Sequence, residues 1–186
     1  MKSLTRAGLL ALSMTFSLAP AAVMAETANS LDIQHLVHAG QDSAQEHQAE
    51  VAARHFYAFW NTGDEAALNL AIAPTFTDHT LPPGRPQGPE GPATASRVFR
   101  QAVPDLEVRV REMIVAGEYV TTHMIFSGHF TGTFPTADGE TVSGEGQPVE
   151  FIATDLVKVT DGKITDNWHI EDNLTLLTQM GLVSAR

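Results

Sequence analysis

The chain contains no cysteine. Disulfide bonds, thiolate nucleophiles and thiolate metal sites are therefore all excluded. Export without disulfides is compatible with a bacterial periplasm, and it means that the hydrophobic core alone must stabilise the fold.

Basic residues are scarce. The 186 residues include 11 Lys and Arg against 22 Asp and Glu, which gives a formal net charge of −11. A surface of this sign repels phosphate backbones, and no stretch combines Lys or Arg with aromatic residues, so binding to nucleic acid is not expected. Anionic membranes are disfavoured for the same reason.

Long apolar runs are missing after the N-terminus. There, Lys2 and Arg6 precede an apolar run over residues 7–24, which ends in the small-x-small sequence Val23-Met-Ala25. This pattern predicts a secretory signal peptide over residues 1–25 and a periplasmic or secreted protein without membrane contact after cleavage. An uncleaved anchor is the alternative, but small residues and a proline leave the run shorter than the roughly 20 residues that a spanning helix needs.

Large apolar side chains are also few in residues 26–45, which predicts a flexible leader with at most a short helix over residues 31–37. His35 and His38 could contact a metal ion, but no third ligand is near, so two solvated histidines are the stronger interpretation. The globular domain is predicted over residues 46–186, a length that can bury one core.

Three helices and then four long strands are expected in this domain. Apolar residues at three- and four-residue spacings indicate the helices, and Gly63, the acidic N-cap Asp64 and Pro74 mark their ends. Alternation of apolar and polar residues indicates the strands. The expected helices are 46–61, 64–73 and 92–102, with a short strand at 75–80 between the last two. The four long strands are expected at 106–115, 119–130, 148–159 and 164–172. Helices followed by strands indicate an α+β fold.

The first helix carries four aromatic residues, Phe56, Tyr57, Phe59 and Trp60. Such a stripe is more often ordinary core than a ligand site. We expect both roles, with some rings packed inward and Phe59 or Trp60 in contact with a ligand.

The last predicted strand follows the turn dipeptide Asp161-Gly162. Strict alternation from Ile164 places Trp168, Ile170 and Asp172 on one face. A carboxyl group beside Trp and Ile loses hydration, which raises its pKa toward neutral, so Asp172 is a candidate for proton transfer. The alternative is that Asp172 caps the helix that begins near Leu174, and the local sequence alone favours this cap.

Several segments in order resemble the SnoaL-like polyketide cyclase (ester cyclase) family of the NTF2-like superfamily. They span roughly residues 46–183 and comprise Pro104-Asp105-Leu106, Gly128-His129-Phe130-Thr131-Gly132, Gly162-Lys163-Ile164, Trp168, Asp172 and Leu176-Leu177-Thr178-Gln179-Met180-Gly181. The resemblance implies a cone in which three N-terminal helices pack on a strongly curved, mainly antiparallel sheet, with a short C-terminal helix and a deep apolar pocket. It also implies a homodimer.

The resemblance further implies a site without metal or organic cofactor. In the resembled cyclases the residue equivalent to Asp172 is the acid/base of an intramolecular aldol closure, so the ligand would be a small hydrophobic carbonyl compound. His129, between two glycines, and His79 would contact the carbonyl or its enolate, and His123, Trp168 and Ile170 would line the pocket. A metal site built from these histidines and Asp172 is disfavoured, because alternation places His169 and Glu171 on the other face.

Two functions therefore remain open. One is a cofactor-independent acid/base enzyme that acts on a small carbonyl or ester substrate, as an aldol-type cyclase or a related isomerase or hydrolase. A serine hydrolase is not indicated, since no Gly-x-Ser-x-Gly motif is present. The other is a non-catalytic periplasmic protein that binds a small hydrophobic ligand, which the signal peptide favours because polyketide tailoring is expected in the cytoplasm.

Overall fold

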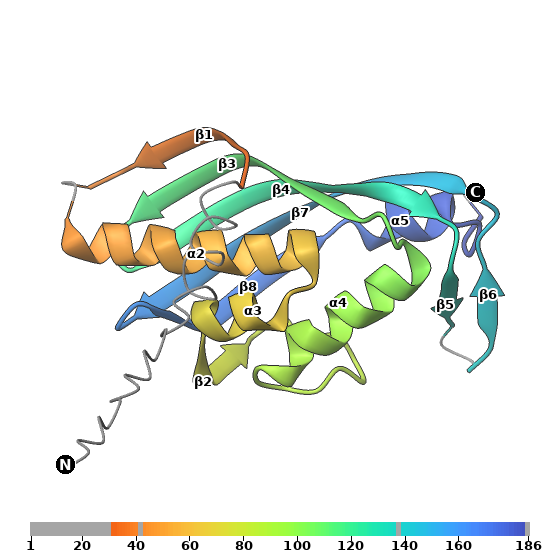
Figure 1. The fold of residues 1–186 in the computed structure, drawn as a ribbon, viewed down its shortest axis with the longest axis horizontal. Helices are drawn as coiled ribbons and strands as arrows, with labels where there is room; N and C mark the ends of the chain where they lie inside the picture. Colours follow the sequence, from red (N-terminus) through yellow and green to blue (C-terminus); the bar gives the residue numbers. More distant parts are fainter. Residues whose placement is uncertain (1–30, 41–42, 137–138, 185–186) are drawn as a thin grey trace, which may run out of the picture.

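The computed structural model describes residues 31–40, 43–136 and 139–184, so the predicted signal peptide lies outside the described residues. Helices α2, α3 and α4 lie on one face of a six-stranded sheet, and a short helix, α5, ends the chain (Figure 1). The helices are α2 (Ala44–Thr62), α3 (Glu65–Ala71), α4 (Glu90–Ala102) and α5 (Asn173–Gln179). The strands are β1 (Ile33–His38), β2 (Ile72–Asp78), β3 (Glu107–Ala116), β4 (Tyr119–Phe130), β5 (Thr133–Pro135), β6 (Thr141–Ser143), β7 (Gln147–Thr160) and β8 (Lys163–Glu171).

The strand order in the sheet is β1-β3-β4-β7-β8-β2, and β5 and β6 form a separate hairpin. The four long central strands are antiparallel, whereas β1 and β2 join the two edges in parallel. The α+β class, the three helices that precede the long strands and the short C-terminal helix are thus confirmed.

The segment before the first helix differs from its prediction. Residues 33–38 form β1, which pairs with β3, instead of a short helix in a flexible leader. Ile33 packs against the core, and His38 Nε2 lies 3.1 Å from Glu50 Oε2 on α2. Backbone hydrogen bonds to β3 and these two contacts stabilise β1 as an edge strand. The hydrophobicity of this segment alone does not predict it.

Helix α2 provides the centre of the core. It begins at the N-cap Ser43, whose hydroxyl accepts a hydrogen bond from the backbone of Glu46, and it packs against β3, β4, β7 and β8. Phe56, Tyr57 and Phe59 are fully buried there. The aromatic stripe of this helix is therefore mostly core, as its spacing indicates.

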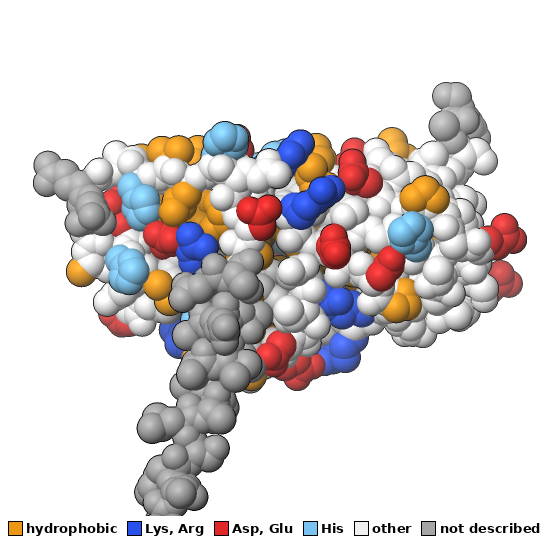
Figure 2. Space-filling view, turned by 45° about the horizontal axis from the view of Figure 1, so that its top comes forward, with side chains coloured by type: hydrophobic (Ala, Val, Ile, Leu, Met, Phe, Trp, Pro, Cys, Tyr) orange, Lys and Arg blue, Asp and Glu red, His pale blue; other side chains and the backbone are white. Residues whose placement is uncertain are grey.

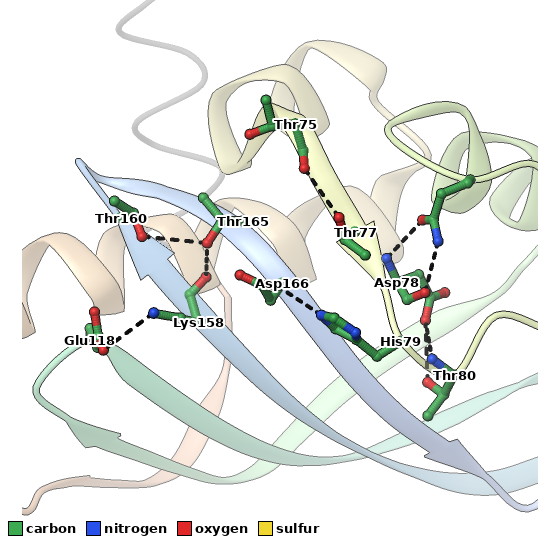
Figure 3. A network of polar contacts seen from close by, with 11 residues as sticks. Thr75, Thr77, Asp78, His79, Thr80, Glu118, Lys158, Thr160, Thr165 and Asp166 are labelled. Atoms are coloured by element: carbon green, nitrogen blue, oxygen red, sulfur yellow. Dashed lines mark hydrogen bonds and ion pairs between the residues drawn. The ribbon is translucent and has the colours of Figure 1, made fainter.

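A β-bulge in β8 decides which side chains reach the interior. Asp161 and Gly162 both have positive φ, 50° and 72°, as the predicted tight turn to β8 requires. Ile164 pairs with Val159 but Asp166 pairs with Lys158, so Thr165 is an extra residue without a partner. Its hydroxyl lies 3.4 Å from the carbonyl oxygen of Lys158 (Figure 3). An extra residue reverses the alternation beyond it.

Acidic and basic side chains are interspersed on the face of the molecule that Figure 2 shows. Within the described ranges, no helix is both long enough and apolar enough to cross a membrane.

Candidate functional site

A single carboxyl group interrupts the apolar row of β7. Side chains of this strand alternate strictly between buried and solvent-facing, and the buried row includes Val149, Phe151, Ala153 and Val157. Asp155 occupies the same row and is only 6% exposed. A charged group in such a position must be paired or must change its pKa.

The neighbouring strands bring further polar groups beside Asp155. Its register partners are Thr122 on β4 and His169 on β8. On the far side of β8, Asp78 of β2 pairs with Asn167. Because the bulge turns Asn167, His169 and Glu171 inward, three strands contribute ionisable groups to one interior position.

His169 lies between two carboxylates. Its Nε2 is 3.1 Å from Asp78 Oδ2, and its Nδ1 is 3.5 Å from Glu171 Oε1. The backbone N–H of His169 also donates to the hydroxyl of Thr80, 2.8 Å away, and Thr80 N donates to Asp78 Oδ1 at 2.9 Å. The end of β2 therefore fixes the orientation of the imidazole.

Burial opposes a charge on His169, but the hydrogen bond to Glu171 and the negative charges of Glu171, Asp78 and Asp155 outweigh it. Together they raise the pKa of His169 to about 9. At neutral pH the side chain is therefore an imidazolium that can donate from both ring nitrogens.

Desolvation is the main cause of the shift at Asp155, and the charges of Glu171 and Asp78 add to it. Although the His169 charge acts in the opposite direction, the pKa of Asp155 is raised to about 7. Tyr57, from α2, interacts with Asp155 and Thr122, and burial raises its pKa well above the ordinary value, so the phenol stays neutral. Among the described residues, its hydroxyl has no partner at good hydrogen-bond geometry.

Glu171 is the third carboxyl group of the cluster. Burial would raise its pKa, but the hydrogen bond from His169, the His169 charge and the charge of Arg85 lower it, so Glu171 is ionised at neutral pH. Besides Asp78 and Arg85, the site thus holds the His169 cation, the ionised Glu171 and Asp155, an acid that is half-ionised near neutral pH.

These groups line a small inner pocket. Its volume open to water is about 20 Å³, room for about one water molecule. Trp60, Phe126 and Met124 provide apolar walls, and Asp78, Asn167 and the cluster described above provide the polar side.

A much larger groove, of about 830 Å³, lies outside this pocket. Arg85 and Glu171 line both the groove and the inner pocket. The rest of the groove is mainly apolar and comes from the loop before α4, from α4, from the segment around β5 and from α5 with the residues after it. These side chains include Pro82, Val98, Phe99, Phe134, Leu177 and Leu182.

A row of aromatic rings runs from the inner pocket, which Trp60 and Phe126 line, to the groove, which Phe99 lines. Trp60 contacts Phe126 edge-on at 5.9 Å between ring centroids, Phe126 stacks on Phe151 at 5.1 Å, and Phe151 stacks on Phe99 at 5.9 Å. The interior is thus narrower than the deep pocket that the resemblance implies.

Across the described ranges, no group of three or more His, Cys, Asp or Glu has an arrangement that could hold a metal ion.

The predicted position of Asp172 was wrong. Asp172 does not line the inner pocket; it is the N-cap of α5 and accepts hydrogen bonds from the backbone N–H and the hydroxyl of Thr175, at 3.0 and 2.7 Å. These bonds lower its pKa, whereas burial would have raised it. The alternative interpretation, a helix cap, is the one observed.

Three other predicted contacts lie on the outer face of the sheet, two of them because of the bulge in β8 and one by the plain alternation of β4. Beyond the bulge, Trp168 stacks on His79 at 4.4 Å, and Ile170 is 78% exposed. His123, on β4, lies 2.8 Å from the hydroxyl of Thr154 on the solvent-facing side of β7. The expectation that Trp168, Ile170 and His123 line the pocket was therefore wrong.

His79 also faces outward. Figure 3 shows its ring reaching Asp166, with Nε2 2.8 Å from Oδ1, while the carboxylate of the adjacent Asp78 points the other way, toward Thr80. Neighbouring residues of a strand take opposite faces, so Asp78 occupies the interior position that we expected for His79.

His129 is exposed and binds the chain that leads into β3. Asp105 accepts from its backbone N–H at 2.8 Å and lies 2.7 Å from its Nδ1. A Cβ atom on Gly128 would come within 2.4 Å of the Val103 side chain, so this glycine permits a close approach of that side chain and not of ligand. Of the two predicted α2 contacts, Trp60 lines the inner pocket, whereas Phe59 is fully buried behind it.

Sequence reasoning missed Asp155, His169 and Glu171. For Asp155 the signal was present, because a charged residue in an otherwise apolar row of a regular strand is unusual. For His169 and Glu171 the sequence held no such signal, because uninterrupted alternation along the strand places both side chains on the outer face.

Solved structures of other proteins resemble this chain. A candidate polyketide cyclase from Bacillus cereus ATCC 10987 is 36% identical, covers 83% of this chain and 95% of its own, and has a TM-score of 0.70. IdmH, a candidate polyketide cyclase from Streptomyces antibioticus, is 28% identical over 73% of this chain and 99% of its own, with a TM-score of 0.62.

A third structure supports the fold alone. It comes from Catenulispora acidiphila DSM 44928, is described as having a ketosteroid isomerase-like fold, and is 20% identical over 71% of this chain and 93% of its own, with a TM-score of 0.54. No curated protein matches the chain. The family model of the SnoaL-like polyketide cyclases matches residues 50–180, well over half of the chain, and the chain therefore belongs to that family.

Proposed function

We propose that the protein is a cofactor-independent acid/base enzyme that moves a proton at a carbon atom next to a carbonyl group. The observation that supports this most directly is Asp155, a carboxyl group that lines the inner pocket beside the His169 imidazolium and has a pKa of about 7. A base whose pKa matches the working pH combines a sufficient ionised fraction with sufficient proton affinity.

In the proposed reaction the ionised Asp155 accepts the proton from the substrate carbon. The electron pair of the broken C–H bond moves to the carbonyl oxygen and forms an enolate. The charges of His169 and Arg85 beside the pocket stabilise this developing negative charge. Tyr57 is buried outside the pocket lining and interacts with Asp155 electrostatically, so its proposed role is that of a positioning residue.

Two outcomes conserve atoms and charge. The enolate carbon can attack a second carbonyl of the same molecule, and the resulting alkoxide takes the proton back from Asp155, which is an aldol-type cyclisation. Alternatively, Asp155 returns the proton to a different carbon, which is an isomerisation. Membership of the SnoaL-like family and the relatives named as candidate polyketide cyclases support the first.

The test is turnover of a panel of β-keto esters and lactones by the wild type and by Asp155→Asn, with binding followed separately by calorimetry. We expect Asp155→Asn to lose about 10²–10⁴-fold in kcat while it keeps ligand affinity. Binding of the panel without turnover by the wild type would contradict the proposal and leave a protein that binds a hydrophobic ligand.

A further inference from the structure

The size of the inner pocket limits what can reach Asp155. A pocket of about 20 Å³ admits a group about the size of one water molecule. A carbonyl group at the end of a slim chain meets this limit, whereas a fused ring system does not. The stacked rings of Trp60, Phe126 and Phe151 fill the space in which a wider substrate would lie.

The groove has the opposite properties. Its volume of about 830 Å³ lies in the upper part of the 300–1,000 Å³ range that is typical of small-molecule sites. Its walls are mainly apolar, with Val98 and Phe99 from α4 and Leu176 and Leu177 from α5. Groups of this kind bind hydrocarbon by removing it from water.

Arg85 and Glu171 connect the two spaces, because both side chains line the pocket and the groove. Their charges lie where the apolar groove borders the polar pocket. One molecule that occupies both must therefore be polar at one end and apolar along the rest.

We propose, on the basis of the proposed function, that the substrate is amphipathic: its carbonyl end enters the inner pocket, and a slim alkyl chain lies in the groove between α4 and α5. The occupant is thus a ketone or ester with an extended hydrocarbon chain and not a compact polycyclic compound. The groove and the pocket share Arg85 and Glu171 as lining residues and therefore lie side by side, and this adjacency supports the occupant.

The experiment measures binding of unbranched alkan-2-ones, from about 5 to about 13 carbons, by calorimetry. Each methylene that enters the groove should tighten binding by about fourfold until the groove is full. The variant Val98→Trp fills the groove, and it should flatten the series for long chains while leaving the shortest ketones unchanged.

The matched control is Val51→Trp, since Val51 is a valine on α2 that is 39% exposed and lines neither space. It should reproduce the wild-type series. Affinity that does not depend on chain length in the wild type, or an equal response of the two tryptophan variants, would overturn the proposal. This experiment measures binding and not turnover. If the wild type binds the ketones but turns nothing over, the proposed function fails while the proposal of an amphipathic ligand can still hold.

Discussion

Asp155 has unusual chemistry because two opposing effects act on one carboxyl group. Desolvation and two neighbouring acids favour the neutral form, while the His169 imidazolium favours the ionised form. The result is a pKa of about 7 for Asp155 and of about 9 for His169. Between pH 7 and pH 9, the Asp155 carboxylate is therefore ionised and can act as a base, while His169 is still protonated.

The first prediction at this scale is a bell-shaped pH profile. Activity requires the ionised Asp155, so kcat/KM should rise as pH increases through about 7. It also requires the protonated His169, so kcat/KM should fall as pH increases through about 9. Steady-state kinetics from pH 5 to pH 10 measure both limbs.

The variant His169→Gln tests which residue causes each limb of the pH profile. Loss of the imidazolium removes the charge that lowers the pKa of Asp155, so the rising limb should move to higher pH and the falling limb near 9 should disappear. An unchanged falling limb in this variant would show that His169 is not the group that titrates there.

At the same scale, the sequence contained the signal for Asp155 but not its partners. Regular alternation along residues 148–159 was predicted correctly, and the acid in its buried row could have been singled out. The pairing of Asp78 with His169 joins β2 to β8, which are 91 residues apart at these positions, and single-sequence patterns carry no information on such a contact.

At the scale of elements, the bulge at Thr165 separates the expected site from the observed one. The helix start at the acidic N-cap Asp64 and the alternation of β4 followed from local chemistry, whereas Pro74, which was expected to end the preceding helix, lies inside β2. A β-bulge depends on contacts with the partner strand, here on the contact between the Thr165 hydroxyl and the carbonyl oxygen of Lys158 in β7. The sequence of β8 alone therefore does not show the bulge.

Asp172 provides the prediction at this scale. Because its carboxylate caps α5, Asp172→Ala should lower the melting temperature by about 2–4 °C. Asp172→Asn is the matched control, since asparagine caps helices equally well, and it should melt close to the wild type. Differential scanning calorimetry measures both, and equal melting of all three proteins would contradict a capping role.

At the scale of the whole molecule, α2, α3 and α4 cover one face of the sheet, and no helix among the described residues covers the other (Figure 1). The α+β fold and the family followed from the order of segments along the chain, because each segment carries its own local pattern. The narrowness of the interior could not be predicted, since it depends on how rings from α2, α4, β4 and β7 stack.

The homodimer that the family resemblance implies stays a prediction. Ile114, Ile152, Leu156 and Ile170 are exposed on strands of the sheet, and Ile152 and Ile170 are 49% and 78% exposed. Apolar side chains in contact between two copies would be removed from water. Sedimentation velocity should give the mass of two chains, and Ile152→Glu should shift it to one; a monomer in the wild type would contradict the prediction.

The most direct test of the account is exchange of the proton next to the carbonyl of a β-keto ester in D₂O, followed by NMR at neutral pD. We expect the wild type and Asp172→Asn to catalyse the exchange at similar rates and Asp155→Asn to be slower by about 10²–10⁴-fold. Fast exchange in Asp155→Asn together with loss of exchange in Asp172→Asn would contradict this expectation and assign the proton transfer to the helix cap.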